Sequence, residues 1–286
     1  MKFGIGTASF IKNYGLLKIK GNKKDLRSII TKYSNKIDLV DTAPSYGFAE
    51  RDIGKSINPN LKIVTKISKI KSKKTNSIIK EIEKKILKSL KTMNKDKIYC
   101  IMFHNENDII KLNDKKIIEY LNNLKKKGTV KKIGISCYDT NRIPQYLKII
   151  KFDVIQFPLN ILSMTKKKII LLRVLKKNYK LELHVRSIFL QGVILNNSKK
   201  LQKKFLFLKE KQDQIKKFCL KKKISINSFL ISAIYSLQFI DYAIIGLKNL
   251  SEYNELKNTK LILFKQSFLE KFLLKNQSDI DPRNWY

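Results

Sequence analysis

Four side chains in the first half of the chain could act together in proton transfer: Asp41, Tyr46, Lys66 and His104. A phenol with its ordinary pKa, about 10, is a weak acid at neutral pH. A neighbouring ammonium favours phenolate and lowers that pKa, and a buried carboxylate keeps the ammonium charged and in place. Tyr46 between Lys66 and His104 would then be a proton donor for a carbonyl oxygen, with the Asp41 carboxylate behind the amine.

Reduction of a carbonyl group also needs a hydride, which no side chain can supply, so the set implies a nicotinamide cofactor. Each residue alone has an ordinary structural explanation. Asp41 could cap a helix, Lys66 could be a solvated strand-end charge, and His104 could be a hydrogen-bonded polar residue. Their recurrence at equivalent positions along the chain, at or just after the ends of apolar runs, favours a shared site.

Short apolar runs rich in isoleucine or valine alternate with helical patterns. The runs occupy residues 2–7, 37–42, 61–67, 98–104, 131–136, 152–157, 181–187 and 242–247. Each run is typical of a strand that is buried on both faces. Between them, residues 75–93 and 114–128 place apolar side chains at helical spacing. The first of these helices is expected to begin at a Thr75 or Asn76 cap, and the second at an acidic cap.

Eight strands interleaved with helices match the size of a (β/α)8 TIM barrel, although alternation alone leaves an open, doubly wound sheet possible. No linker rich in glycine, proline or serine divides the chain, so we expect residues 1–286 to form a single domain. The functional face of a β/α barrel lies at the carboxyl ends of its strands. Asp41, Lys66 and His104 stand at the ends of the second to fourth runs, and Ser136 ends the fifth.

The chain carries a net charge of +38, and lysine supplies most of it, since only six of the 61 basic residues are arginine. A specific nucleic-acid binder usually relies on arginine and concentrates its charge on one element. Here lysine is scattered through the polar segments together with isoleucine and asparagine, which indicates a compositional bias. We expect weak, non-specific attraction to polyanions and no specific nucleic-acid partner.

Three cysteines, Cys100, Cys137 and Cys219, are far apart in the sequence and lack the spacing of a metal site. Their odd number disfavours a disulfide framework and fits a reducing compartment. The N-terminus lacks the sustained apolar core of a signal peptide. Polar residues interrupt the most apolar later stretch, 224–247, which makes it a poor membrane span. We therefore expect a cytoplasmic protein with no membrane partner and no metal.

Several stretches resemble the aldo-keto reductases, which are NAD(P)-dependent (β/α)8 oxidoreductases. The most specific match is "DTAPSYGFAERDIG" at residues 41–54. The similarity continues through "IVTKI", "YCIMFH", "GTVKKIGIS", "VIQFPLN" and "AIIGLKN", and so extends over essentially the whole chain. The resemblance implies that Asp41, Tyr46, Lys66 and His104 are the catalytic residues. It also implies that Ser136 and Gln156 hold the carboxamide of the nicotinamide.

The chain departs from the family pattern at three places that bear on the cofactor. Cys137 replaces a common asparagine, which removes one carboxamide contact. Arg186 replaces the aromatic residue that stacks on the nicotinamide, and it could instead reach a cofactor phosphate, an anionic substrate or a nearby carboxylate. Glu252 stands where NADP-preferring members carry a cation, and a carboxylate suits a free ribose hydroxyl better than a phosphate. Lys248 could compensate, so both NADP and NAD remain candidate cofactors.

The cofactor phosphates are expected over the seventh and eighth strands, where Gly192 and Gly246 would allow close approach or serve as simple turn glycines. The lysine-rich stretch 199–223 is expected to contain helices with solvated charge. The pair "RSIFLQG" and "DPRNW" resembles a subgroup of bacterial aldo-keto reductases that is associated with surface polysaccharides and nucleotide sugars. That resemblance implies a sugar-derived carbonyl substrate.

We therefore expect an NAD(P)H-dependent oxidoreductase that reduces an aldehyde or ketone to an alcohol. Its partner would be a small-molecule carbonyl compound, and the protein would be a monomer or weak homo-oligomer. One fold hosts many functions. The alternative is therefore a cofactor-binding regulatory or sensor protein on the same barrel, with little turnover.

Overall fold

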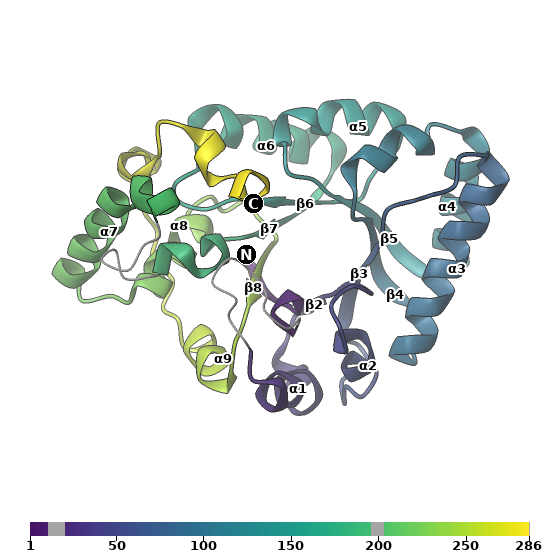
Figure 1. The fold of residues 1–286 in the computed structure, drawn as a ribbon, viewed down its shortest axis with the longest axis horizontal. Coiled ribbons are helices and arrows are strands. Elements are labelled where there is room, and N and C mark those ends of the chain that lie inside the picture. The colour runs from purple at the N-terminus through teal and green to yellow at the C-terminus, as the bar shows by residue number, and fades with distance from the viewer. Residues whose placement is uncertain (11–20, 196–202, 286) are drawn as a thin grey trace.

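The computed structural model describes residues 1–10, 21–195 and 203–285, and eight parallel strands close into a barrel in chain order (Figure 1). The strands are β1 (Lys2–Gly6), β2 (Leu39–Asp41), β3 (Lys62–Ile67), β4 (Ile98–Phe103), β5 (Val130–Ser136), β6 (Val154–Pro158), β7 (Glu182–Arg186) and β8 (Tyr242–Gly246). Pairing of β1 with β8 closes the barrel and sets Gly6 opposite Gly246. The expected barrel is confirmed, and the open sheet is excluded.

Helices lie around the strands (Figure 1). The α-helices are α1 (Lys23–Lys32), α2 (Ala49–Ile53), α3 (Thr75–Met93), α4 (Lys115–Lys126), α5 (Ile143–Ile149), α6 (Lys166–Tyr179), α7 (Lys209–Lys222), α8 (Ile226–Tyr235), α9 (Leu250–Lys257) and α10 (Gln266–Leu269). Among the helices of the described residues, none is both long and apolar enough to cross a membrane. Part of the lysine-rich stretch, residues 199–202, lies outside the described residues, and the rest contains α7 as expected.

The two helices expected in detail form within two residues of the predicted bounds, but only one has the predicted cap. The acidic cap of α4 is Asp114, whose carboxylate accepts the backbone N–H groups of Lys116 and Ile117. Helix α3 begins at Thr75 as expected, yet neither Thr75 nor Asn76 caps it. The Thr75 hydroxyl instead donates to Asp114 Oδ2 at 2.6 Å, so it joins the two helix starts. A tertiary contact has replaced the local cap.

Strand alternation sorts the side chains inside the barrel into levels. Side chains two residues apart point to the same face of a strand, so Lys62, Val64 and Lys66 of β3 stand one above another. Val64 belongs to a buried apolar layer. The other members of that layer are Leu39, Cys100, Met102, Val154, Tyr242 and Ile244. This layer fills the barrel and leaves Lys66 at the carboxyl end of its strand, at the barrel mouth.

The amino end of the barrel is polar, which differs from the expectation of strands that are apolar on both faces. Glu182 accepts from Lys132 Nζ at 2.5 Å and from the Tyr99 hydroxyl at 2.7 Å. Its other oxygen lies 2.7 Å from His184 Nε2. Lys62 Nζ donates to the Tyr242 hydroxyl at 2.9 Å. These contacts offset much of the cost of placing polar residues inside the barrel, although the buried Nδ1 of His184 has no hydrogen-bond partner among the described residues.

The C-terminal segment returns over the loops that follow the strands, and Figure 1 shows it in yellow near β6 and β7. Leu274 N–H and the Gln277 side chain both donate to the carbonyl of Leu162, in the loop after β6. Arg283 donates to Glu106 in the loop after β4, at 3.2 Å. A cluster of aromatic rings links the start of this segment to α7 and α8: Phe218, Phe229, Phe264, Phe268 and Phe272.

Candidate active site

A buried ion pair stands at the centre of the barrel mouth. Lys66 Nζ lies 2.6 Å from Asp41 Oδ1, and both side chains are almost fully buried, with 1% and 7% of their surface exposed. The ammonium also donates to the carbonyl oxygen of Thr42 at 3.1 Å. The second oxygen of Asp41 accepts Gln156 Nε2 at 2.7 Å. The carboxylate is therefore satisfied from two sides, as a buried charge must be.

Tyr46 reaches the same place from the turn after β2. The turn is closed by Tyr46 N–H, which donates to the carbonyl of Ala43 at 2.9 Å, and Gly47 follows with a positive φ of 62°. Lys66 Nζ lies 5.3 Å from the centre of the Tyr46 ring. The His104 ring meets Tyr46 edge to face, with ring centres 6.2 Å apart. The structure thus brings together the four residues that the sequence predicts as catalytic.

The pKa of Tyr46 shifts in the direction opposite to the sequence expectation. Burial raises the pKa of the phenol well above its usual value, the Asp41 carboxylate raises it further, and the Arg186 guanidinium opposes the shift. Burial is the largest cause, and Asp41, which pairs directly with Lys66, adds to it where the ammonium was expected to favour phenolate. Tyr46 is accordingly a neutral hydroxyl at physiological pH, able to donate a hydrogen bond.

His104 is neutral at physiological pH for a related reason. Burial lowers the pKa of its imidazole to about 4, Lys66 lowers it further, Asp41 opposes the shift, and Arg186 adds the smallest lowering effect. A protonated imidazole would be partly desolvated and close to two cations. One ring nitrogen of the neutral form can donate a hydrogen bond and the other can accept one.

Gln156 offers an unused acceptor next to the ion pair. Its Oε1 is buried and has no hydrogen-bond partner in the described structure, while its amide nitrogen is committed to Asp41. A buried acceptor without a partner is costly, and it fits an amide N–H of a ligand. Ser136 stands opposite Gln156 in the register of β5 and β6. The two residues expected to hold a carboxamide are therefore neighbours at the mouth.

Cys137, which follows Ser136 at the end of β5, is part of the hydrophobic core. Its side chain is fully buried within the hydrophobic core, and burial raises the pKa of the thiol to about 12. Its backbone N–H donates to the carbonyl of Gln156 at 2.9 Å. The residue therefore contributes to the mouth by holding the loop after β5, and its thiol points into the protein interior.

The end of β8 and the start of α9 are organised by Glu252. One oxygen of Glu252 accepts the backbone N–H of Lys248 at 2.7 Å, and the other lies 2.9 Å from Lys248 Nζ. The cap residue Asn249 accepts the N–H of Glu252. At Gly246 a Cβ would meet no atom within 4 Å, and its φ is not in the left-handed region. Neither packing nor backbone conformation requires glycine there, which leaves room for a ligand.

The loop after β7 has an unusual backbone. Ser187, Leu190 and Gln191 adopt positive φ angles of 61°, 50° and 54°, and Gly192 has a φ of 85°. Glycine at 192 is therefore explained by its turn conformation, whatever else it does. From α7, the buried Gln212 donates to the carbonyl of Val193 at 2.8 Å and so supports this loop.

Three residues at the mouth were not singled out from the sequence as site residues. Tyr138, two positions after Ser136, lies under the guanidinium of Arg186 and also under that of Arg283. Glu106 accepts from Arg283 Nη1 at 3.2 Å and from the Tyr138 backbone N–H at 3.3 Å. The signal available in the sequence was the position of Tyr138, directly after a predicted strand end.

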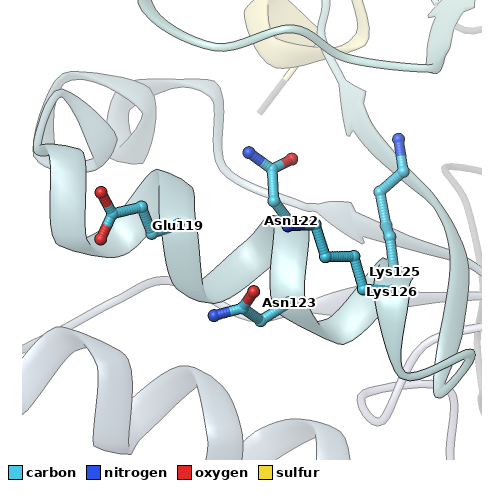
Figure 2. A pocket seen from close by; sticks show the side chains of 5 residues that line it. All are labelled: Glu119, Asn122, Asn123, Lys125 and Lys126. Carbon is cyan, nitrogen blue, oxygen red and sulfur yellow. The ribbon is translucent and has the colours of Figure 1, made fainter.

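A hollow on the outer face of α4 lies apart from this constellation (Figure 2). It is lined by Glu119, Asn122, Asn123, Lys125 and Lys126, all from that one helix. Lys125 is engaged in an ion pair with Asp153 at 2.6 Å. The lining has no convergence of groups from several elements, and we place no chemistry there.

Comparison with known proteins supports the same family as the geometry of the barrel mouth. The sequence profile of the aldo/keto reductase family matches residues 2–272. No curated protein sequence matches the chain significantly. A solved aldo-keto reductase from Bacillus halodurans, in its holo form, superposes with a TM-score of 0.73 at 15% identity, covering 98% of this chain and 95% of that one.

Two further solved structures resemble this chain about as closely as the Bacillus halodurans enzyme does. A glycerol dehydrogenase from Gluconobacter oxydans gives a TM-score of 0.69 at 17% identity, covering 94% of this chain and 90% of that one. An aldo-keto reductase from Klebsiella pneumoniae, in complex with NADPH, gives 0.70 at 15% identity over 98% and 94%. At such identities the structural matches show the fold, whereas the profile shows the family. The chain belongs to the aldo/keto reductase family.

Proposed function

We propose that the protein is an NAD(P)H-dependent reductase that converts an aldehyde or ketone to an alcohol, with residues 1–286 acting as one domain. The observation that carries the proposal is the placement of the Tyr46 phenol beside the Lys66–Asp41 pair and the neutral His104 imidazole. A donor of this kind serves a carbonyl oxygen that gains negative charge during reduction. Family membership and the NADPH complex of a structural neighbour support the choice of cofactor.

In this mechanism the chain's residues position the carbonyl and supply the proton. The Tyr46 hydroxyl donates to the carbonyl oxygen and transfers its proton as charge builds there. Lys66 lies beside the Tyr46 ring and stabilises the phenolate that results, while Asp41 holds Lys66 in place. His104, being neutral, orients the carbonyl oxygen by a hydrogen bond. A bound nicotinamide supplies the hydride.

For the cofactor, we propose that Gln156 Oε1 and the Ser136 hydroxyl hold the carboxamide at the mouth. The support is the unpartnered acceptor of Gln156 and its neighbour across the β5–β6 register. We place the phosphates over the loops after β7 and β8, near Gly192 and Gly246. The open space at Gly246 supports close approach of a ligand there.

The adenosine end of the cofactor is proposed to meet Lys248 and Glu252 at the start of α9. Because Glu252 already pairs with Lys248, the cation is partly neutralised and the carboxylate is held near the 2′ position. NADP and NAD therefore both remain candidate cofactors, although Glu252 disfavours a 2′-phosphate.

The proposed substrate class, compartment and oligomeric state rest mainly on the sequence. The pair "RSIFLQG" and "DPRNW" supports a sugar-derived substrate of the kind used with surface polysaccharides and nucleotide sugars. The three cysteines are free and buried, which agrees with our proposal of a cytoplasmic enzyme. We propose that it works as a monomer or weak homo-oligomer on a small-molecule substrate.

The first experiment is a fluorescence titration with NADPH and with NADH, run in about 0.3 M salt so that screening suppresses non-specific attraction of anions. Saturable binding of either dinucleotide, followed by carbonyl-dependent oxidation of it, is the expected result. Binding without turnover of any aldehyde or ketone would favour the regulatory alternative. Absence of binding by both would remove the reductase mechanism altogether.

A further inference from the structure

Two arginines from distant parts of the chain meet at one tyrosine. The guanidinium carbon of Arg186, at the end of β7, lies 4.3 Å from the centre of the Tyr138 ring. The guanidinium carbon of Arg283, in the C-terminal segment, lies 4.6 Å from the same centre. Arg186 belongs to the motif "RSIFLQG" and Arg283 to the motif "DPRNW". The two motifs are far apart in the sequence, and in the fold both contact Tyr138.

The two arginines differ in how their charge is balanced. Arg283 pairs with Asp281 at 2.6 Å and with Glu106 at 3.2 Å. Apart from its stacking on Tyr138, the contact of Arg186 with the described residues is a long one of 3.5 Å to the hydroxyl of Ser187. Throughout the part of the chain that the structure describes, no carboxylate lies within ion-pair distance of Arg186. Of the alternatives open for Arg186, pairing with a nearby carboxylate is therefore not found among the described residues.

Arg186 is also close to the reacting groups. By strand alternation it shares the inner face of β7 with His184, so it stands at the mouth of the barrel. Its charge helps to lower the pKa of both His104 and Tyr46, which places the guanidinium within electrostatic reach of both. Asp281 is within reach too, but its oxygens are taken by Arg283.

A partly buried cation without a counter-ion is unfavourable, and a second guanidinium on the same ring adds to the repulsion. Such an arrangement is expected where an external anion completes the charge balance. The guanidinium presents a planar fork that matches the oxygens of a carboxylate or phosphate. Stacking on Tyr138 holds that fork in one orientation, within electrostatic reach of Tyr46.

We propose that Arg186, held by Tyr138, binds an anionic group, a carboxylate or phosphate, that the carbonyl substrate itself carries. The inference rests on the proposed reductase function and narrows its substrate to anionic aldehydes or ketones. It assigns Arg186 to the substrate and not to a cofactor phosphate, because Arg186 ends β7 on its inner face and its charge acts on Tyr46 and His104. The Glu106–Arg283 contact keeps the C-terminal segment against Tyr138 and so supports this site.

The test compares matched substrates in about 0.3 M salt. One pair is 4-formylbenzoate and its methyl ester, and the other is glyceraldehyde 3-phosphate and glyceraldehyde. The first measurement is kcat/KM for each compound with wild type, Arg186→Gln and Arg186→Lys. The matched control is Arg173→Gln, which removes the same charge from the exposed face of α6, where Arg173 stacks on Phe239.

In Arg186→Gln we expect the preference for the anionic member of at least one pair to fall by roughly 10-fold or more. Arg186→Lys should restore part of the preference, and Arg173→Gln should leave it unchanged. An equal loss on both members of each pair would overturn the proposal. Such a loss combined with weaker NADPH or NADH binding would assign Arg186 to a cofactor phosphate.

A failure of the reductase function is distinguished by direct binding. If wild type turns over none of the four compounds, calorimetric titration with 4-(hydroxymethyl)benzoate and with its methyl ester decides the question. Binding of the acid that exceeds binding of the ester, and that is lost in Arg186→Gln, would support the anion site on a protein without this activity. Equal binding, or no binding of the acid, would overturn it.

Discussion

At the scale of single residues, Asp41 is the group on which the mouth of the barrel depends. One oxygen holds Lys66 and the other holds Gln156, so one carboxylate orders both the proposed proton-transfer groups and the proposed carboxamide contact. The same carboxylate raises the pKa of Tyr46 instead of leaving the ammonium free to lower it. In the proposed mechanism, the proton of Tyr46 therefore stays in place until a carbonyl oxygen takes up charge.

Tyr46→Phe tests this donor. Removing the hydroxyl takes away the proton donor and keeps the ring, so we expect kcat to fall by a factor of roughly 10² to 10⁴. Cofactor affinity, measured by fluorescence titration, should stay within about threefold of wild type, since the proposed cofactor contacts are untouched. Turnover close to the wild-type rate would show that another group donates the proton.

His104 predicts a pH dependence of stability. Its folded-state pKa, lowered to about 4, lies below the ordinary value of about 6.5, so the unfolded chain takes up the proton first. Stability that is present above pH 6.5 is therefore lost as the pH falls towards 4. The loss due to this residue should approach roughly 3 kcal/mol.

Urea unfolding of wild type and of His104→Gln, measured between pH 7.5 and pH 4, isolates that effect. The free energy of unfolding of wild type should fall more steeply than that of the variant as the pH drops from about 6.5 to about 4. Parallel curves for the two proteins would contradict a neutral, buried imidazole.

At the scale of elements, the ends of strands and the starts of helices decide which groups are available. The β8–α9 junction is a compact case, because Glu252 caps the backbone of Lys248 and pairs with its ammonium. The sequence places both residues at this junction, but it leaves their pairing open. Lys248 and Glu252 lie four residues apart at the start of α9. Which of the two charges a bound dinucleotide meets therefore decides whether the junction favours or disfavours a 2′-phosphate.

Glu252→Gln tests the proposed role of this junction. The change removes a carboxylate near the 2′ position and frees Lys248, so the affinity for NADPH relative to NADH should rise by about 5-fold, as expected for a partly exposed charge. Fluorescence titrations with both dinucleotides measure the ratio. Glu255→Gln is the matched control, one helical turn further along α9, and it should leave the ratio unchanged. An unchanged ratio in Glu252→Gln as well would place the 2′ position elsewhere.

At the scale of the whole molecule, the barrel separates two polar layers by an apolar one. The layer at the mouth carries the proposed chemistry, whereas the charges at the amino end pair with one another through Glu182. Burial alone would raise the pKa of Glu182, but hydrogen bonds from His184 and Lys132 lower it to about 2. Stability from Glu182 is therefore present above its ordinary pKa and is lost as the pH falls towards 2.

Glu182→Gln should destabilise the fold without changing the chemistry. Breaking a largely buried pair leaves Lys132 without its partner, at a cost of roughly 3 kcal/mol in the free energy of unfolding at pH 7. Asp38→Asn, which breaks the exposed pair with Lys2, is the comparison and should cost less than about 0.5 kcal/mol. Denaturant unfolding gives both values, and kcat of Glu182→Gln should match wild type. A lowered kcat would mean that the two layers are coupled.

The sequence by itself determined the positions of the eight strands and the four residues expected to be catalytic. This was possible because short apolar runs and strand alternation are local properties, and because the ends of parallel strands meet at one edge. The cap of α3 shows the limit of such reasoning. A hydroxyl that could have capped its own helix was drawn to Asp114 of another.

Only the tertiary structure decided which charges meet and which remain without a partner. The direction of the Tyr46 pKa shift, the polar layer below the barrel core and the meeting of Arg186 with Arg283 at Tyr138 all depend on contacts between residues far apart in the sequence. Electrostatic energies depend on distance and burial, and neither can be read from spacing along a chain. The sequence led to the candidate residues Asp41, Tyr46, Lys66 and His104, but their charge balance and the contacts of Tyr138 required the fold.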